Sequence, residues 1–197
     1  MIIRKGAAEI ERIARAGALV AATIARVGER VEAGITTGEL DEIAEAFITE
    51  HGGVATSKGY GGSSTQAPFP RAICISVNDV VVHGIPDGTA LVAGDIVTID
   101  VGVTLDGAIA DSAYTFPVGQ IDSEVERLLT VCQEALGAGV MQAQVENRVG
   151  DISHAVQTLV EDAGFSIVRS LVGHGVGRHY HEEPHVPNFG QAGRGPK

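Results

Sequence analysis

The stretch Ile99–Phe116, IDVGVTLDGAIADSAYTF, predicts a β-hairpin that decides the fold. At its centre lies Asp106-Gly107, among the strongest of short hairpin signals, and mostly apolar residues flank it on both sides. When these two residues form the loop, counting back along the ladder places Asp100 opposite Ala113. The sequence therefore predicts not only two antiparallel strands, Asp95–Leu105 and Ala108–Phe116, but also their register.

This register brings two carboxylates together. Asp111 becomes the diagonal neighbour of Asp100 on one face of the hairpin, roughly 7–8 Å away at the backbone. The alternate residues of the first strand point to the other, apolar face: Val97, Ile99, Val101 and Val103. Two like charges among buried strands repel and are costly to desolvate, and a bound cation would remove both problems. The alternative, a solvated strand face with two ordinary aspartates, stays open at this point.

The residues before the hairpin predict two helices, a loop and a strand. Apolar residues recur every three or four positions from Ala7 to Val31, which is typical of an amphipathic helix. Thr36, with a glutamate three residues later, forms a capping box that opens a second helix, and this helix ends near His51. The Gly-, Ser- and Pro-rich stretch 57–70 is expected to be a loop, and 71–77 a strand.

The residues after the hairpin repeat this order. Ser123, with Glu126, is expected to cap a third helix, and Asp151 a fourth that Gly164 ends. Residues 165–172 are expected to form a strand, and a loop to follow. The repeat indicates a pseudo-symmetric α+β fold in one domain, residues 1–197, with an N-terminal half 1–120 and a C-terminal half 121–197 that lacks its last hairpin.

Composition narrows the classes of function. Apolar residues make up 44% of the 197 residues, which is enough for a globular core, and the net charge of −11 disfavours nucleic acid or an anionic membrane as the main partner. The sequence predicts no signal peptide and no membrane span, so we expect a cytoplasmic protein. Cys74 and Cys132 lie in apolar runs and are expected to be buried and reduced.

A second candidate for chemistry is the stretch 173–187, GHGVGRHYHEEPHVP, which holds four of the seven histidines. Imidazole is a common ligand of transition metals, and the three glycines allow close approach of the backbone to another element. His179 and His185 can also be read as ordinary surface residues. Taken by itself, His83 is more typical of a loop histidine than of a catalytic one. The sequence contains no Ser nucleophile elbow and no phosphate-binding P-loop.

Three motifs together, ICISVNDVVVHGIP (73–86), the hairpin at 99–116 and GHGVGRHYHEEP (173–184), resemble type I methionine aminopeptidases in order and spacing. The resemblance covers nearly the whole chain. It implies the pita-bread fold, in which two pseudo-symmetric halves surround an antiparallel sheet. It also implies a hydrolase that removes the initiator methionine from nascent polypeptides, acting as a monomer near the ribosome.

The resemblance further implies a site that holds two divalent ions, Co, Mn, Fe or Zn, on two Asp, one His and two Glu ligands. By motif match, Asp100, Asp111 and His174 correspond to three of these five ligands. His83 and His181 are implied to contact substrate and to stabilise the tetrahedral intermediate. Tyr60 and Phe69 match aromatic positions of the methionine pocket.

Family members continue past the position of Lys197 with both glutamate ligands, so the resemblance implies a truncated chain with partial or no metal occupancy. Glu182 and Glu183 fall outside the implied ligand set. Two other readings remain: a non-catalytic pita-bread module that binds a partner, and a fragment completed by another chain.

We expect the 197-residue chain alone to bind divalent metal weakly and to hydrolyse a Met-Ala peptide little or not at all, because two of five implied ligands would be missing. Calorimetric titration with Mn²⁺ or Co²⁺ and an assay of released methionine measure this. Full activity at micromolar metal would contradict the expectation, and extension past Lys197 is expected to restore activity.

Overall fold

The computed structural model describes residues 1–65 and 67–197, which form two compact units. The N-terminal unit comprises Arg4–Ile121 and the short segment Val176–Tyr180. The C-terminal unit comprises Met1–Ile3, Asp122–Gly175 and His181–Lys197. No helix in the described part of the chain has the length and apolar character needed to cross a membrane.

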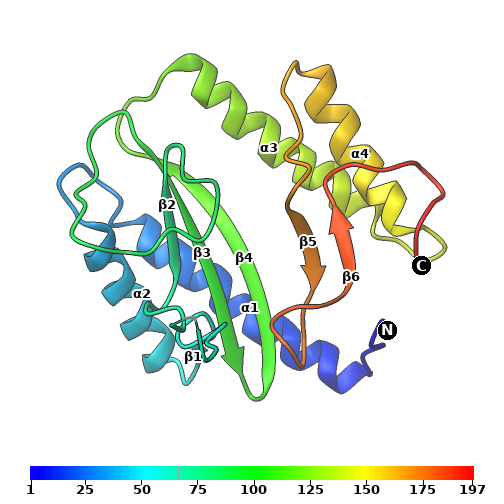
Figure 1. Cartoon of the computed structure of the whole chain (residues 1–197), viewed down its shortest axis with the longest axis horizontal. Coiled ribbons are helices and arrows are strands. Elements are labelled where there is room, and N and C mark those ends of the chain that lie inside the picture. Colours follow the sequence, from blue (N-terminus) through cyan, green and yellow to red (C-terminus); the bar gives the residue numbers. More distant parts are fainter. Residues whose placement is uncertain (66) are drawn as a thin grey trace. The chain divides into compact units, whose positions relative to one another are not determined.

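A four-stranded antiparallel sheet forms the centre of the N-terminal unit (Figure 1). The long strand β3 (Ile96–Leu105) pairs along its length with β4 (Ala108–Pro117). Its other edge pairs with two short strands, β1 (Val54–Ala55) and β2 (Cys74–Val77). The strand β1 is an element that the sequence did not predict.

Two helices, α1 (Ala7–Gly28) and α2 (Thr37–Glu50), pack on this sheet. The apolar face of β3 is completely buried in the shared core, which confirms the predicted alternation. The helices contribute the residues of their apolar stripes to the same core: Ala16, Leu19, Val20, Ile24, Val27, Leu40, Ala44 and Ile48. Removal of this apolar area from water is the main source of the unit's stability.

The predicted register of the hairpin is confirmed. Leu105 pairs with Ala108 across the turn, and Asp100 lies opposite Ala113. Asp111 lies opposite Gly102 and is therefore the diagonal neighbour of Asp100.

Strand β2 begins later than expected because a buried aspartate accepts the backbone hydrogen bonds of the residues before it. Asp41 of α2, only 2% exposed, accepts hydrogen bonds from the backbone N–H groups of Ala72 (2.9 Å) and Ile73 (3.0 Å). These donors are therefore bound to a side chain rather than to a strand. The strand predicted over 71–77 accordingly begins only at Cys74.

The C-terminal unit contains a helix pair and a small hairpin. Helices α3 (Ser123–Gln142) and α4 (Val149–Asp162) pack together around Val131, Ala135 and Val160. Strand β5 (Val172–Gly175) pairs antiparallel with β6 (Glu182–Pro187). Within the chain, two helices followed by antiparallel strands therefore occur twice.

One predicted strand and one predicted loop in this unit were wrong. Residues 165–172, expected to be a strand, pair only at Val172, because Phe165 and Ile167 pack on the helix pair instead. The stretch expected to be a loop after them contains most of β5 and all of β6.

Two cap predictions were also wrong. Asp122, not Ser123, caps α3, since its carboxylate accepts the N–H of Glu124 (2.8 Å). Helix α4 begins at Val149, ahead of Asp151, which accepts the N–H of Arg148 from within the first turn (2.7 Å).

The two cysteines differ in burial. Cys74 is buried, as expected, but Cys132 is exposed. The buried residues of α3 follow Val131 at intervals of four, so Cys132 lies one residue away from that stripe and faces outward.

The cap of α2 gives a direct test of the fold. Thr36 Oγ1 accepts the N–H of Glu39 (3.1 Å), and the Glu39 carboxylate accepts the N–H of Thr36 (2.8 Å). Thr36→Ala is expected to cost about 1 kcal/mol, which corresponds to a fall of roughly 2–4 °C in melting temperature. Thr49→Ala, at an exposed position of the same helix, is the control, and an equal loss in both variants would contradict the cap's role.

Candidate functional site

The two aspartates of the hairpin interact directly with each other. Burial is the main cause that raises the pKa of Asp111 to about 7, and the like charge of Asp100 and a hydrogen bond to it add to the effect. The Oδ1 atom of Asp111 is buried. Across the other edge of β3, Cys74 pairs with Asp100. The carboxylates thus converge at one place on the sheet, as the hairpin register predicted.

An aromatic side chain from the segment Val176–Tyr180 packs beside this pair. A hydrogen bond of 2.9 Å joins Tyr180 Oη to Ser57 Oγ, and the rings of Tyr180 and Tyr60 meet edge to face at 5.1 Å. Burial and the charge of Asp111 raise the pKa of Tyr180 above its usual range. Tyr180 lies directly over Gly102, where an added Cβ would come within 2.3 Å of the tyrosine oxygen.

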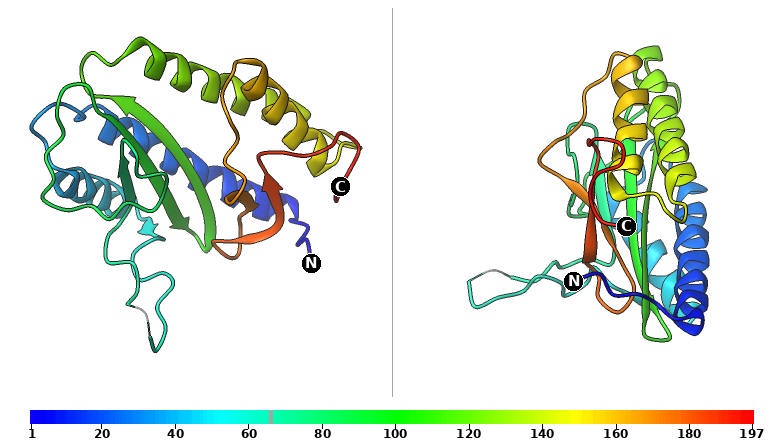
Figure 2. Two further views of the ribbon diagram at one scale, coloured as in Figure 1. Left: turned by 45° about the horizontal axis from the view of Figure 1, so that its top comes forward. Right: turned by 90° about the vertical axis from the view of Figure 1, so that its right-hand side faces the viewer.

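The predicted aromatic residues lie at the base of the loop between β1 and β2. Gly59 donates its N–H to the Phe69 carbonyl (2.8 Å), and Phe69 donates to the Tyr60 carbonyl (2.9 Å). These bonds hold Tyr60 and Phe69 side by side, while the loop beyond them extends away from the sheet (Figure 2). Gln66 of this loop lies outside the described residues. Phe69 is half-buried, and the structure shows Tyr60 in contact with Tyr180.

His83 is exposed and has a positive φ of 58°, which is uncommon for a residue other than glycine. The next residue fixes the loop, because Gly84 donates to Ser76 Oγ (3.2 Å) and accepts the N–H of Ile75 (3.0 Å). A Cβ at position 84 would lie 2.1 Å from the Ile75 carbonyl oxygen, so only glycine fits there. The backbone directly after His83 is therefore tightly fixed.

Two predicted histidines come together in the C-terminal unit. The rings of His174 on β5 and His181, which directly precedes β6, lie 4.1 Å apart. His174 Nδ1 lies 3.0 Å from the carbonyl oxygen of Gly175. Because a carbonyl can only accept, Nδ1 donates in this contact, which leaves Nε2 as the ring nitrogen that can bind a metal. This is the arrangement that a metal-binding histidine needs.

The structure thus brings together Asp100 with Asp111, His174 with His181, and Tyr60 with Tyr180. In residues 1–65 and 67–197, no group of three or more His, Cys, Asp or Glu side chains is close enough to hold a metal ion. The donor types nevertheless fit a divalent cation. Two partly buried carboxylates that lie together gain from a positive charge between them, and imidazole nitrogen is a ligand type that such cations accept.

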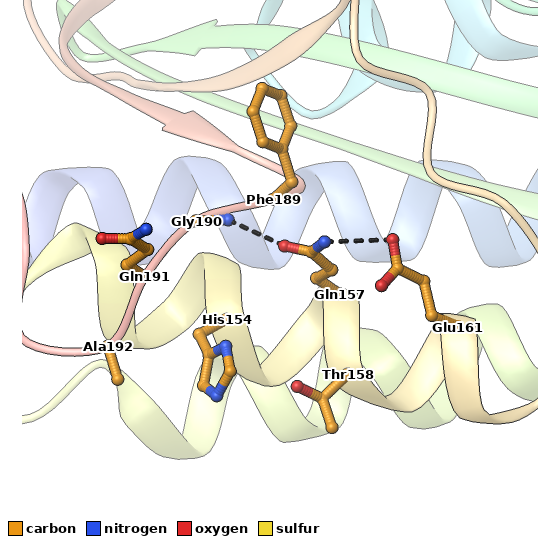
Figure 3. Close-up of a pocket in the computed structure, with 8 residues that line it drawn as sticks. All are labelled: His154, Gln157, Thr158, Glu161, Phe189, Gly190, Gln191 and Ala192. Carbon is orange, nitrogen blue, oxygen red and sulfur yellow. Dashed lines mark hydrogen bonds between the residues drawn. The ribbon is translucent and has the colours of Figure 1, made fainter.

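An open pocket of about 620 Å³ lies elsewhere, in the C-terminal unit (Figure 3). The pocket is lined by α4 and by residues 189–192, which cross that helix. Gln157 of α4 accepts the N–H of Gly190 (3.1 Å) and donates to Glu161 (3.0 Å). None of the site residues predicted from the sequence lines this pocket.

Sequence reasoning missed Tyr180 and Gly102. A glycine inside a strand signals close approach by another group, and Gly102 carried that signal. The partner could not be named, because Tyr180 lies 78 positions later in the chain and reaches Gly102 only in the folded unit.

Comparison with known proteins identifies the family. The description "Metallopeptidase family M24" matches residues 11–196. Methionine aminopeptidase from Clostridium perfringens is 49% identical over 197 residues, which are 100% of this chain and 77% of the relative. The chain belongs to the methionine aminopeptidases.

Further comparisons agree. Methionine aminopeptidase 1 from Bacillus subtilis is 44% identical over 100% of this chain and 77% of its own length. The crystal structure of methionine aminopeptidase from Rickettsia prowazekii matches with a TM-score of 0.94 at 35% identity, over 99% of this chain and 76% of that one. As a methionine aminopeptidase, the chain is a metal-dependent hydrolase with the α+β pita-bread fold that the sequence predicted.

The fit between Gly102 and Tyr180 can be tested by one added methyl group. Gly102→Ala is expected to displace the tyrosine ring and to destabilise this methionine aminopeptidase by about 1–3 kcal/mol, since the space is already filled. Thermal unfolding and near-ultraviolet circular dichroism of the tyrosines measure the two effects. Gly88→Ala, where nothing lies within 4 Å of the new atom, is the control. Equal behaviour of the two variants would show that Tyr180 does not occupy this place.

Proposed function

We propose that this chain belongs to an enzyme that hydrolyses the first peptide bond of a polypeptide and releases its N-terminal methionine, and that its residues take part in the catalytic site. The observation that carries the proposal is the pair Asp100–Asp111, two partly buried carboxylates that interact directly, in a chain 49% identical to a curated methionine aminopeptidase. Such a pair is costly to bury unless a cation binds it.

Asp100, Asp111 and His174 would hold the divalent ions, together with the two glutamates implied by the family resemblance. Divalent ions held there would lower the pKa of water and so would provide the nucleophile at neutral pH. The ions are proposed to be Co, Mn, Fe or Zn, because carboxylate and imidazole ligands accept all four.

The remaining residues act on the substrate. His83 and His181 are proposed to donate hydrogen bonds to the peptide carbonyl oxygen and so to stabilise the charge that develops on it. Tyr60 and Phe69 are proposed to line the pocket for the methionine side chain, and the contact between Tyr60 and Tyr180 supports an aromatic wall there.

Cys74 is excluded as a competing nucleophile. Burial, and then the charges of Asp100 and Asp111, raise the pKa of its thiol to about 12. The thiolate that nucleophilic attack requires is therefore scarce at neutral pH. Cys74 instead packs as a small apolar residue beside the aspartates.

The partners are proposed from the same resemblance. Nascent polypeptide N-termini are the proposed substrates, met in the cytoplasm near the ribosome, and the protein is proposed to act as a monomer in a single domain. The net charge of −11 supports the exclusion of nucleic acid and anionic membranes as binding partners.

The function is tested by fusing the chain to the part of the Clostridium perfringens relative that its match does not cover. Release of methionine from a Met-Ala peptide is then measured with Mn²⁺ or Co²⁺. The fusion is expected to hydrolyse the peptide, and Asp100→Asn is expected to lower kcat by at least about 100-fold, because the amide cannot supply the negative ligand. Asp106→Asn, at the exposed turn of the same hairpin, is the matched control.

A folded fusion without metal-dependent activity would overturn the proposal.

The two other readings of the sequence, a non-catalytic module and a fragment completed by another chain, give different results. A non-catalytic module would bind no divalent metal at Asp100 and Asp111, so calorimetry of the wild type and of Asp100→Asn would agree. A fragment completed by another chain would gain activity only when that chain is added to it.

A further inference from the structure

The segment Val176–Tyr180, here called the strap, belongs to the N-terminal unit although the residues on both sides of it belong to the C-terminal unit. It lies within the histidine-rich stretch. His181 follows its last residue directly, and His174 precedes its first by two positions. Both histidines are therefore joined to the strap by a very short stretch of chain.

The first anchor of the strap is its backbone at Gly177. The N–H of Ile109, on β4, donates to the Gly177 carbonyl at 2.8 Å. A Cβ at this glycine would lie 2.5 Å from the Lys5 side chain and 3.2 Å from Ile13 of α1. The strap therefore lies close against both the hairpin and the first helix.

The second anchor is an ion pair. Arg178 Nε donates to Glu9 Oε1 at 2.7 Å. The other oxygen of Glu9 accepts the N–H of Gly6 at 2.9 Å, so the carboxylate is held at the start of α1. The hydrogen bond from Arg178, then that from Gly6, lowers the pKa of Glu9 to about 2. Glu9 is thus ionised at every pH at which the protein would work.

The third anchor is Tyr180, which is joined to Ser57 and lies over Gly102. It is the last residue of the strap, and one trans peptide bond separates it from His181. Consecutive Cα atoms lie about 3.8 Å apart, so a fixed Tyr180 keeps the Cα of His181 within this distance of the strap.

We propose that Glu9 and Arg178 are positioning residues, whose ion pair fixes the strap and through it places His174 and His181 for the reaction. The inference rests on the proposed function, in which these histidines hold metal and polarise the substrate. Neither Glu9 nor Arg178 touches substrate or metal in this role.

The expected loss of stability and the expected loss of rate distinguish a positioning role from a stabilising one. The side chain of Arg178 is 56% exposed and that of Glu9 24%, so solvent screens the pair and its loss changes the melting temperature little. A catalytic group displaced by about 1 Å, by contrast, can lower the rate by roughly 100-fold. Loss of the pair should therefore affect the histidines and the rate far more than it affects unfolding.

The experiment compares Arg178→Gln and Glu9→Gln with Arg15→Gln. Arg15 also lies on α1, its side chain is about as exposed as that of Arg178 (49% against 56%), and its ion pair of 2.8 Å is with Asp106 rather than with the strap. Hydrogen exchange is measured on peptides that cover Ile109 and residues 176–181 of the 197-residue chain. The imidazole NMR signals of His174 and His181 are recorded on the same samples.

Both strap variants are expected to exchange up to about fivefold faster at these amides and to shift both histidine signals, while Arg15→Gln behaves as the wild type. Arg178→Lys, which keeps the charge, is expected to restore part of the protection. In the active fusion, kcat should fall about tenfold or more with KM nearly unchanged.

Unchanged hydrogen exchange in Arg178→Gln would show that the ion pair does not fix the strap. Unchanged histidine signals despite faster exchange would overturn the positioning role. Inactivity of the wild-type fusion would instead count against the proposed function, because exchange and NMR report on the strap without activity.

Discussion

The pairing of β3 with β4 through a two-residue turn is the constraint on which the rest of the structure depends. Because side chains alternate between faces, this one register sends the apolar residues of β3 to the helices and both aspartates to the opposite face. A slip by one residue would exchange the two faces completely. The core would then receive Asp100, and the site would receive Val101. Hydrophobic burial and the assembly of the site are therefore consequences of the same hydrogen-bonded ladder.

The face that carries the aspartates is unusual in its chemistry. Two partly buried carboxylates, a thiol and a phenol gather there, and desolvation raises the pKa of Asp111, Cys74 and Tyr180 alike. Each of these groups is therefore held nearer to its neutral form than it would be in water. A cation would reverse this condition for the carboxylates, so the protein without metal stores unfavourable electrostatic energy at the place where metal is proposed to bind.

The features that the sequence predicted well are local or periodic. The hairpin register followed from Asp106-Gly107, and the cap of α2 from the spacing of Thr36 and Glu39. The errors arose where a tertiary contact competed with a local pattern. Asp41 delays the start of β2, and the apolar residues after α4 pack on helices instead of pairing. For the site, the two aspartates followed from spacing, whereas the place of Tyr180 could not, because only the fold brings it to Gly102.

The strap makes the N-terminal unit discontinuous in sequence, and this has a consequence during synthesis. The ribosome adds residues in order, so the sheet and its two helices emerge long before Val176–Tyr180. Until then, the amide of Ile109 lacks its partner on the strap, and Gly102 remains uncovered by an aromatic ring. The first unit can collapse early, but it is completed only after the helix pair α3–α4 has also been made. The order of translation therefore places the closure of the aspartate site among the last steps of folding.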